Sequence, residues 1–245
     1  MLILKIGGSV ITDKSVGAVN KAKFEEIERI ARMIAENLKD ELVLVHGVGS
    51  FGHPHVVKYR LDEKKNINGV AVTHLSCVSL NMIVCGYLHQ FGLNPVPIHP
   101  LSSFKIVDGK LVFDVELIKA LIDEGFVPVV HGDMVYNLTE KKFEILSGDR
   151  IVVELAKVLK PKAVGFATDV EGVLFDGKVL PEITRENAEE ILKGIGEDKS
   201  KSDVTGGMLG KIRSILEIGV DARIFHAKDL DRFLKGEEVG TLVRG

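Results

Sequence analysis

The feature of this sequence that most limits its fold is the regular alternation of short apolar runs with amphipathic helical stretches. This alternation is typical of β-α-β units and a mainly parallel sheet. Between the first two runs, apolar residues recur every three or four positions from Phe24 to Leu38, which predicts a helix with one buried face. A longer, more apolar helix is predicted from Val70 to Phe91. The predicted strands are Leu2 to Ile6, Leu42 to His46, Pro95 to Ile98, Val127 to His131, Ala163 to Ala167, Ala222 to His226 and Thr241 to Val243.

Two stretches depart from this alternation. Residues 104–113 place Asp-Gly between two β-prone runs, and residues 134–146 surround a polar turn, so both are predicted to be hairpins. Excursions of this kind commonly form walls or lids over a site. The chain has no repeat or Pro-rich linker, and a soft boundary near Pro161 divides it into two halves.

Composition and charge exclude several classes of protein. A net charge of −3 argues against a nucleic-acid-binding protein. The apolar run at the N-terminus is too short to cross a membrane or to act as a signal peptide, so we expect a cytoplasmic protein with no membrane partner. Cys77 and Cys85 lie eight residues apart in one predicted helix, about 12 Å, which is too far for a disulfide. The Cys and His spacings match no metal site, so no protein-held metal is predicted.

Glycines follow the first predicted strand at once. In an open parallel sheet, ligands collect at the carboxyl ends of the strands. Gly7, Gly8 and Ser9 stand there, where backbone N–H groups can approach phosphate oxygens. Lys5 lies in the strand itself, and a buried lysine needs an anion or a carboxylate nearby. A lysine at a sheet edge that reaches water is an equally good interpretation of Lys5 alone.

The second strand is followed by Gly47, Gly49 and Gly52 in the pattern G-x-G-x-x-G. A dinucleotide-binding fold requires a helix directly after these glycines and a third strand with an acidic residue about 20 residues further on. The following stretch is instead polar, has Pro54 early, and leads to no adequate strand before residue 95. A dinucleotide-dependent oxidoreductase is therefore disfavoured.

Two later segments each begin a predicted helix. In residues 147–159, Ser147 or Asp149 can be the N-cap, and a simple cap is the preferred interpretation of Asp149 by itself. In residues 203–220, a Gly206-Gly207 pair leads into a helix whose first turns carry Lys211, an arrangement that suits an anion. Lys211 alone is equally consistent with a solvent-facing lysine. Together, glycine-rich and lysine-bearing loops at opposite ends of the chain predict phosphoryl transfer.

These motifs resemble those of the isopentenyl phosphate kinases of the amino acid kinase superfamily. The resemblance rests on KIGGSVITDK (5–14), HGVGSFGHP (46–54), SGD (147–149), TDVEGV (168–173) and DVTGGMLGK (203–211), in order along nearly the whole chain. Three positions depart from the family pattern. Val48 stands where alanine is usual, Arg150 where an acidic or amide residue is expected, and Leu174 where an aromatic residue is common.

The resemblance implies a three-layer α-β-α sandwich with a mainly parallel central sheet. Residues 1–160 would bind the phosphate acceptor and form a homodimer, and residues 161–245 would bind ATP with Mg²⁺. The implied reaction converts isopentenyl phosphate and ATP to isopentenyl diphosphate and ADP, a step of isoprenoid biosynthesis in the alternative mevalonate pathway. A fosfomycin-type or other small-molecule kinase of the same superfamily is the alternative.

The resemblance also implies roles for single residues. The catalytic residues would be Lys5, Lys14, His53, Asp149 and Lys211, with Asp149 orienting the lysines. The acceptor would be bound by Gly47, Val48, Gly52, His53 and Gly148, and His53 would hydrogen-bond its phosphate. The phosphates and the nucleotide would be bound by Lys5, Gly7, Gly8, Ser9, Gly49, Asp169, Gly172, Leu174, Gly207 and Lys211.

The apolar tail of the acceptor needs an apolar pocket beside His53. Ile83 and Val84 in the helix from Val70 to Phe91, and the hairpin that contains Ile145, are the predicted walls. Each of these residues is also consistent with an ordinary place in the core.

Overall fold

All seven predicted strands form, and they lie in one sheet. The structure is a computed structural model that describes residues 1–197 and 202–245, with side chains described except at 194–206 and 218. The sheet order is β12-β14-β13-β9-β1-β2-β6-β3, and only β14 against β13 is antiparallel. Its strands are β1 (Leu2–Ile6), β2 (Leu42–His46), β3 (Pro95–Ile98), β6 (Val127–His131), β9 (Ala163–Thr168), β12 (Glu182–Ile183), β13 (Ala222–His226) and β14 (Thr241–Val243).

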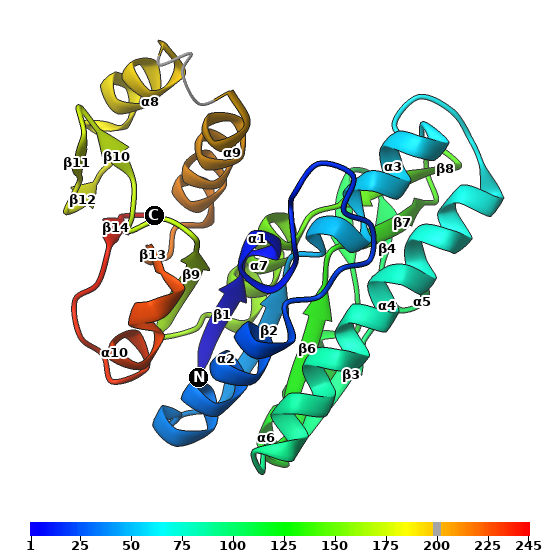
Figure 1. Cartoon of the computed structure of the whole chain (residues 1–245), viewed down its shortest axis with the longest axis horizontal. Helices are drawn as coiled ribbons and strands as arrows, with labels where there is room; N and C mark the ends of the chain where they lie inside the picture. The colour runs from blue at the N-terminus through cyan, green and yellow to red at the C-terminus, as the bar shows by residue number, and fades with distance from the viewer. Residues whose placement is uncertain (198–201) are drawn as a thin grey trace.

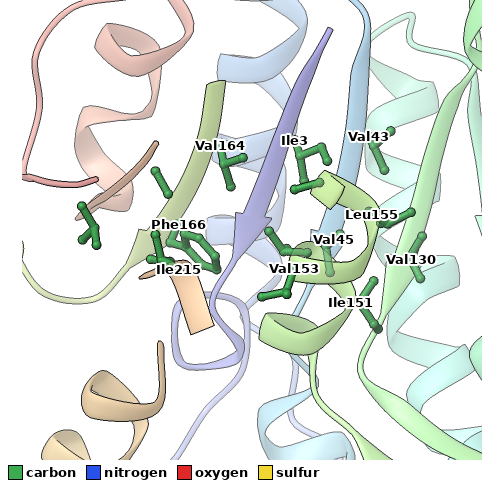
Figure 2. Close-up of a cluster of buried hydrophobic side chains, with 14 of the residues drawn as sticks. Ile3, Val43, Val45, Val130, Ile151, Val153, Leu155, Val164, Phe166 and Ile215 are labelled. Carbon is green, nitrogen blue, oxygen red and sulfur yellow. The ribbon is translucent and has the colours of Figure 1, made fainter. Parts of the chain in front are cut away.

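Helices cover both faces of this sheet, which confirms the predicted three-layer sandwich. Alternate strand residues point to opposite faces, so Ile3 and Val43 pack against α7 (Figure 2) while Leu4 and Leu44 pack against α2. The helices are α1 (Gly8–Ile11), α2 (Phe24–Asn37), α3 (His53–Tyr59), α4 (Ile67–Gln90), α5 (Pro100–Ser103), α6 (Val115–Asp123), α7 (Gly148–Leu159), α8 (Ala188–Glu197), α9 (Ser202–Ile218) and α10 (Leu230–Leu234), with short 3-10 turns at Gly49–Phe51 and Ala227–Asp229.

The two predicted hairpins form outside the main sheet. They are β4 (Lys105–Val107) with β5 (Lys110–Val112), and β7 (Asp133–Asn137) with β8 (Lys142–Leu146), joined into a four-stranded sheet of order β5-β4-β7-β8. Asp108 and Gly109 both have positive φ, 49° and 75°, as the Asp-Gly turn requires. A small further hairpin joins β10 (Leu174–Phe175) to β11 (Lys178–Val179).

One sheet runs through both halves of the chain. The predicted boundary near residue 160 falls between α7 and β9, and β9 pairs directly with β1 of the first half. Figure 1 shows the second half, from yellow-green at β9 to red at the C-terminus, beside the first half at this junction.

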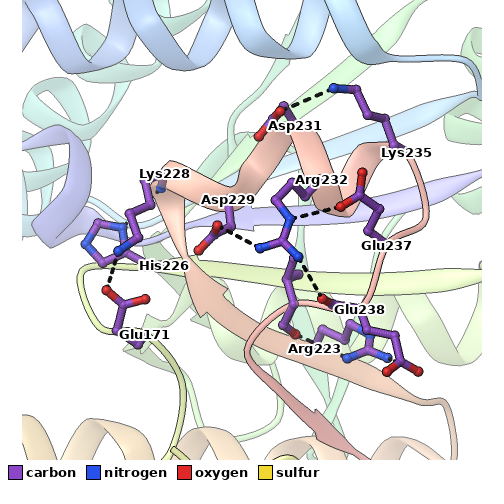
Figure 3. Close-up of polar contacts among 11 residues, drawn as sticks. Glu171, Arg223, His226, Lys228, Asp229, Asp231, Arg232, Lys235, Glu237 and Glu238 are labelled. Atoms are coloured by element: carbon purple, nitrogen blue, oxygen red, sulfur yellow. Dashed lines mark hydrogen bonds and ion pairs between the residues drawn. The ribbon is translucent and has the colours of Figure 1, made fainter.

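Charged residues of the second half gather around β13 and α10 (Figure 3). Arg232 pairs with Asp229 and Glu237, and Lys228 pairs with Glu171 in the loop that follows β9. These pairs are largely exposed to solvent, so each contributes little stability by itself.

Helix α4 is long and apolar enough to cross a membrane, but half of it is buried inside the protein. Leu80 and Leu88 lie in the core on the α2 side of the sheet, and Cys77 and Cys85 are buried free thiols as predicted. We therefore interpret α4 as a core helix.

Two predictions about local structure are wrong. A helix, α3, does follow the glycines of residues 47–52, because Pro54 occupies its first turn, where proline is tolerated. The next strand in sequence is nevertheless β3 at Pro95, so the dinucleotide-binding pattern still fails. Helix α9 begins at Ser202, so Gly206 and Gly207 lie inside it and not before it. The side chains of Asp203 and Thr205, which precede the glycine pair, lie outside the described residues.

The loops after β1 and β2 touch backbone to backbone. A Cβ atom on Gly47 would lie 2.5 Å from the Gly8 nitrogen, and one on Gly8 would lie 2.5 Å from the Gly49 nitrogen. Backbone atoms cannot move aside as a side chain can, so only glycine fits at these two positions.

Gly47→Ala should therefore lower the free energy of unfolding by about 1–3 kcal/mol or more. Gly210→Ala is the matched control, because a Cβ atom at this position meets nothing within 4 Å. Gly210 lies inside α9, where alanine is favoured over glycine by about 1 kcal/mol. Urea denaturation of both variants measures the difference. Equal stability of the two variants would contradict the close approach of the loops.

Candidate active site

A cavity of about 460 Å³ opens at the carboxyl ends of the central strands. Segments far apart in sequence meet there, from the start of the chain to α9. The predicted residues that line it are Lys5, Gly7, Gly8, Ser9, Lys14, Gly47, Val48, Gly49, Gly52, His53, Gly148, Asp149, Asp169, Gly207 and Lys211.

Asp149 lies between two lysines at one end of this cavity. Its Oδ1 atom is 2.8 Å from Lys5 Nζ, and Lys211 Nζ lies 2.9 Å and 3.0 Å from its two oxygens. Lys5 and Lys211 are each only 8% exposed. The ammonium of Lys211 also lies 4.9 Å from the ring centre of Phe166, a favourable cation–π contact.

The fold explains why these three groups meet. Lys5 lies in β1, which is a central strand between β2 and β9, so the sheet-edge interpretation of Lys5 is wrong. Ser147 caps α7 by accepting a hydrogen bond from the Arg150 N–H at 3.1 Å. The carboxylate of Asp149, in the first turn of the helix, is thereby left to bind the lysines.

The charges of the cluster shift the pKa values of Asp149 and Lys211. Burial works to raise the pKa of Asp149, but Lys5 and Lys211 outweigh it and lower that pKa to about 2. Burial and the charge of Lys5 lower the pKa of Lys211 to about 8, and Asp149 only partly compensates. At neutral pH the cluster therefore carries one net positive charge, which suits a bound anion.

Lys14 reaches the cavity from the loop after β1, and this loop is fixed by Thr12. The hydroxyl of Thr12 donates to Gly8 O at 2.7 Å and accepts from the Ser50 N–H at 3.1 Å. Thr12 thus ties the two glycine loops together next to the segment that carries Lys14.

The other end of the cavity combines His53 with apolar residues. His53 is the first residue of α3 and is exposed to solvent. The wall beside it is formed by Val56 of α3, Cys77 of α4, Met134 of β7 and Ile145 of β8. The predicted contribution of the hairpin at Ile145 is present in this wall.

Four predicted site residues do not line the cavity. Val84 packs in the core on the α2 side of the sheet and Ile83 packs against that core, because α4 turns Thr73 and Cys77 toward the cavity instead. Gly172 packs against Thr241 and Val179, and Leu174 lies exposed in β10. The predicted contribution of Ile83 and Val84 to the apolar wall of the cavity is therefore wrong.

A hydrogen bond between His74 and the buried carboxylate of Asp133, beside the cavity, was not predicted from the sequence. Asp133 Oδ2 lies 2.6 Å from His74 Nδ1, and this hydrogen bond raises the pKa of His74. Asp133 also lines the cavity. The available signal was the second His-Gly dipeptide, at 131–132, which repeats the one at 46–47 after a neighbouring strand.

Among the described residues, no group of three or more His, Cys, Asp or Glu side chains is arranged to hold a metal ion. Asp149 is already engaged by two ammonium groups. The described side chains alone thus do not fit a resident metal ion.

Comparison with known proteins gives a family and close relatives. The family model described as "Amino acid kinase family" matches residues 1–225. Isopentenyl phosphate kinase of Methanothermobacter thermautotrophicus is 36% identical and that of Haloferax volcanii 38% identical, each over 100% of this chain and 99% of the relative. A crystal structure of isopentenyl phosphate kinase matches with a TM-score of 0.83 at 33% identity, over 100% of both chains.

The low pKa of Lys211 predicts anion binding that weakens with pH. Its pKa of about 8 lies below the ordinary value of 10.5, so its buried charge costs stability at neutral pH and the cost is relieved above pH 8. A bound anion favours the charged form. Between pH 7 and 9.5 the affinity for sulfate should therefore fall by about tenfold, seen as a smaller sulfate-induced rise in Tm.

Lys211→Arg is the matched control for this titration, because a guanidinium stays charged throughout the range. In this variant the sulfate-induced rise in Tm should persist at pH 9.5. A wild-type response that does not change with pH would show that Lys211 does not titrate near 8.

Proposed function

We propose that this chain, which belongs to the amino acid kinase family and within it to the isopentenyl phosphate kinases, transfers the γ-phosphoryl group of ATP to isopentenyl phosphate. The products are isopentenyl diphosphate and ADP. The observation that carries the proposal is one cavity with a buried Lys-Asp-Lys cluster at one end and His53 beside an apolar wall at the other.

The charged end of the cavity serves the transferring phosphoryl group. Phosphoryl transfer passes through a loose transition state, so catalysis depends on positioning and on neutralising negative charge. Lys5, Lys14 and Lys211 provide positive charge, and Asp149 holds two of them at fixed positions. ATP lies with its phosphates at this end, and residues 161–245 contribute most of its binding site.

The acceptor needs no general base. A phosphate monoester has a second pKa of about 6, so at neutral pH its oxygen is already an anionic nucleophile. Asp149 is unsuited to accept a proton, because its pKa of about 2 keeps it ionised between two cations. His53 donates a hydrogen bond to the acceptor phosphate and holds it in line with the donor.

The apolar wall accounts for the organic part of the acceptor. Val56, Met134 and Ile145 form it beside His53, and they suit a five-carbon hydrocarbon tail. A small polar acceptor such as fosfomycin gains nothing from such a wall. Mg²⁺ would be held by the phosphate oxygens of ATP, because the described side chains gather no set of metal ligands, and it would neutralise part of the phosphate charge. We place the reaction in isoprenoid biosynthesis, by the alternative mevalonate pathway, and in the cytoplasm.

A coupled ADP-release assay tests the proposal. With MgATP, isopentenyl phosphate should be turned over with the highest kcat/KM in a panel that also contains dimethylallyl phosphate, fosfomycin, acetylglutamate and UMP. Turnover of another acceptor in the absence of turnover of isopentenyl phosphate would refute the proposed substrate. His53→Ala should lower kcat/KM for the acceptor by a factor of about a hundred or more and leave the Kd of ATP unchanged.

His89→Ala is the control for this variant, because His89 lies exposed in the last turn of α4 and does not line the cavity. It should keep wild-type kinetics. An equal loss of ATP affinity in His53→Ala would place His53 at the donor end and contradict its assignment.

We also propose that the exposed face of α4 forms a homodimer. Ile67, Leu75 and Met82 on this face are 67%, 64% and 51% exposed, and the whole helix of 24 residues carries no Asp, Glu, Lys or Arg. Leu75 and Met82 lie two turns apart, on one side of the helix. A second copy of the chain is the occupant that fits, because the same uncharged face is self-complementary under two-fold symmetry.

Leu75→Lys combined with Met82→Lys should convert the dimer into a monomer in light scattering after gel filtration, since each lysine would be buried unpaired at the interface. Leu117→Lys is the control, because Leu117 is 54% exposed on α6. A wild-type monomer, or dissociation by the control as well, would refute the interface on α4.

A further inference from the structure

His46 is a polar side chain in an unfavourable place. It ends β2 and is fully buried, as is its partner Asn81 of α4, whose amide lies 3.0 Å from His46 Nε2. The preceding inward residues of β2 on this face, Leu42 and Leu44, are apolar and belong to the core. Burial of a polar pair costs free energy that an apolar side chain of similar size would avoid. This cost indicates that His46 and Asn81 have a role other than packing.

The other ring nitrogen of His46 contacts the loop that lines the cavity. Its Nδ1 atom lies 3.0 Å from the carbonyl oxygen of Gly47, the next residue. A peptide unit is planar and trans, so a Gly47 carbonyl held toward the ring directs the Val48 N–H away from it. Gly47 and Val48 line the cavity together with His53.

The Val48 N–H is available to donate a hydrogen bond to a ligand. Within the described part of the chain, no hydrogen-bond acceptor is recorded for it, whereas the neighbouring Gly47 N–H donates to Ile6 O at 2.9 Å. A backbone N–H held in a fixed direction beside a cavity is a strong partner for a phosphate oxygen.

The position of the ring proton follows from the contacts. Burial lowers the pKa of His46, so the ring is neutral and donates only once. Donation to Asn81 would leave an unprotonated Nδ1 facing Gly47 O at 3.0 Å, which is repulsive. Donation to Gly47 O leaves Nε2 as an acceptor, and a half-turn of the Asn81 amide presents its nitrogen to that atom. This turn gives up the longer hydrogen bond that the Asn81 amide nitrogen donates to Val129 O, at 3.4 Å.

A neighbouring histidine makes the same contact. His131 ends β6, is also fully buried, and its Nδ1 lies 2.9 Å from the carbonyl of the following Gly132. Its Nε2 lies 3.0 Å from His99 Nδ1, a possible donor. The rings of His46 and His131 stack at 5.8 Å.

We propose that His46 is a positioning residue for the acceptor phosphate: its Nδ1–H holds the Gly47 carbonyl, and this hydrogen bond aims the Val48 N–H at a phosphate oxygen of the acceptor. The inference rests on the proposed function for the identity of the acceptor. His46 itself touches no substrate and acts through the peptide between Gly47 and Val48.

Two substitutions of His46 distinguish the effect of its hydrogen bond to Gly47 from the effect of its packing. His46→Asn keeps an N–H donor close to the Nδ1 position but loses most of the ring, whereas His46→Leu keeps similar bulk and loses the donor. We expect His46→Leu to raise KM for isopentenyl phosphate by about ten- to a hundredfold, with KM for ATP unchanged. His46→Asn should remain within about threefold of wild type. Equal losses in the two variants, or a larger loss in His46→Asn, would overturn the proposal in favour of packing.

A second experiment needs neither a variant nor turnover. Nitrogen-15 NMR of the wild-type protein should show His46 as the neutral Nδ1–H tautomer at pH 7 and above, and titration with inorganic phosphate should shift the Val48 amide but not that of Val112 in β5. An Nε2–H tautomer, or a Val48 amide that phosphate leaves unmoved, would overturn the inference. Wild-type protein that binds phosphate in this way but does not turn over isopentenyl phosphate would refute the proposed function alone.

Discussion

The ion pairs between Asp149 and the two buried lysines constrain much of this structure. Lys5 and Lys211 are almost completely buried, and burial of an ammonium without a counter-charge is very costly. The carboxylate must therefore lie within hydrogen-bond distance of both, which requires β1, the start of α7 and the middle of α9 to meet. A single sheet that joins β1 to β9 holds the two halves of the chain in that relation.

The glycine loops impose a second constraint on the same region. Gly8 and Gly47 allow two backbone segments to touch, and Thr12 bonds to both segments. Backbone groups of these two loops consequently line part of the cavity, together with the buried side chains of Lys5 and Lys211. Fixed peptide donors and a few lysines are the groups that phosphoryl transfer requires, because the chemistry asks for positioning and charge neutralisation rather than for a base.

The sequence was sufficient to predict what depends on local pattern and on parallel topology. The strands are short apolar runs, and their carboxyl ends must share one edge of the sheet, so Lys5 and Gly49 could be expected together. Asp149 was placed with them only by the family resemblance, because the strand before it lies in the smaller sheet. The phase of α4 could not be predicted, because that helix is apolar around most of its surface and periodicity does not distinguish its faces. Ile83 and Val84 were therefore assigned to the cavity, where the structure has Thr73 and Cys77. The second His-Gly dipeptide, at 131–132, could have indicated Asp133, but its partner His74 lies 59 residues away and no local pattern links the two.

Helix α4 is apolar around most of its surface because its sides lie in three different environments. Leu80 and Leu88 face the core, Cys77 faces the cavity, and Leu75 and Met82 face outward. A face in contact with solvent alone would tolerate charges, and none occurs along the whole helix. If a second copy of the chain covers the outer face, it contacts the same helix that contributes Cys77 to the proposed acceptor end of the cavity. The proposed dimer would then limit the movement of α4 and fix the width of the apolar end of the cavity, while the charged end is held independently by the Lys-Asp-Lys cluster.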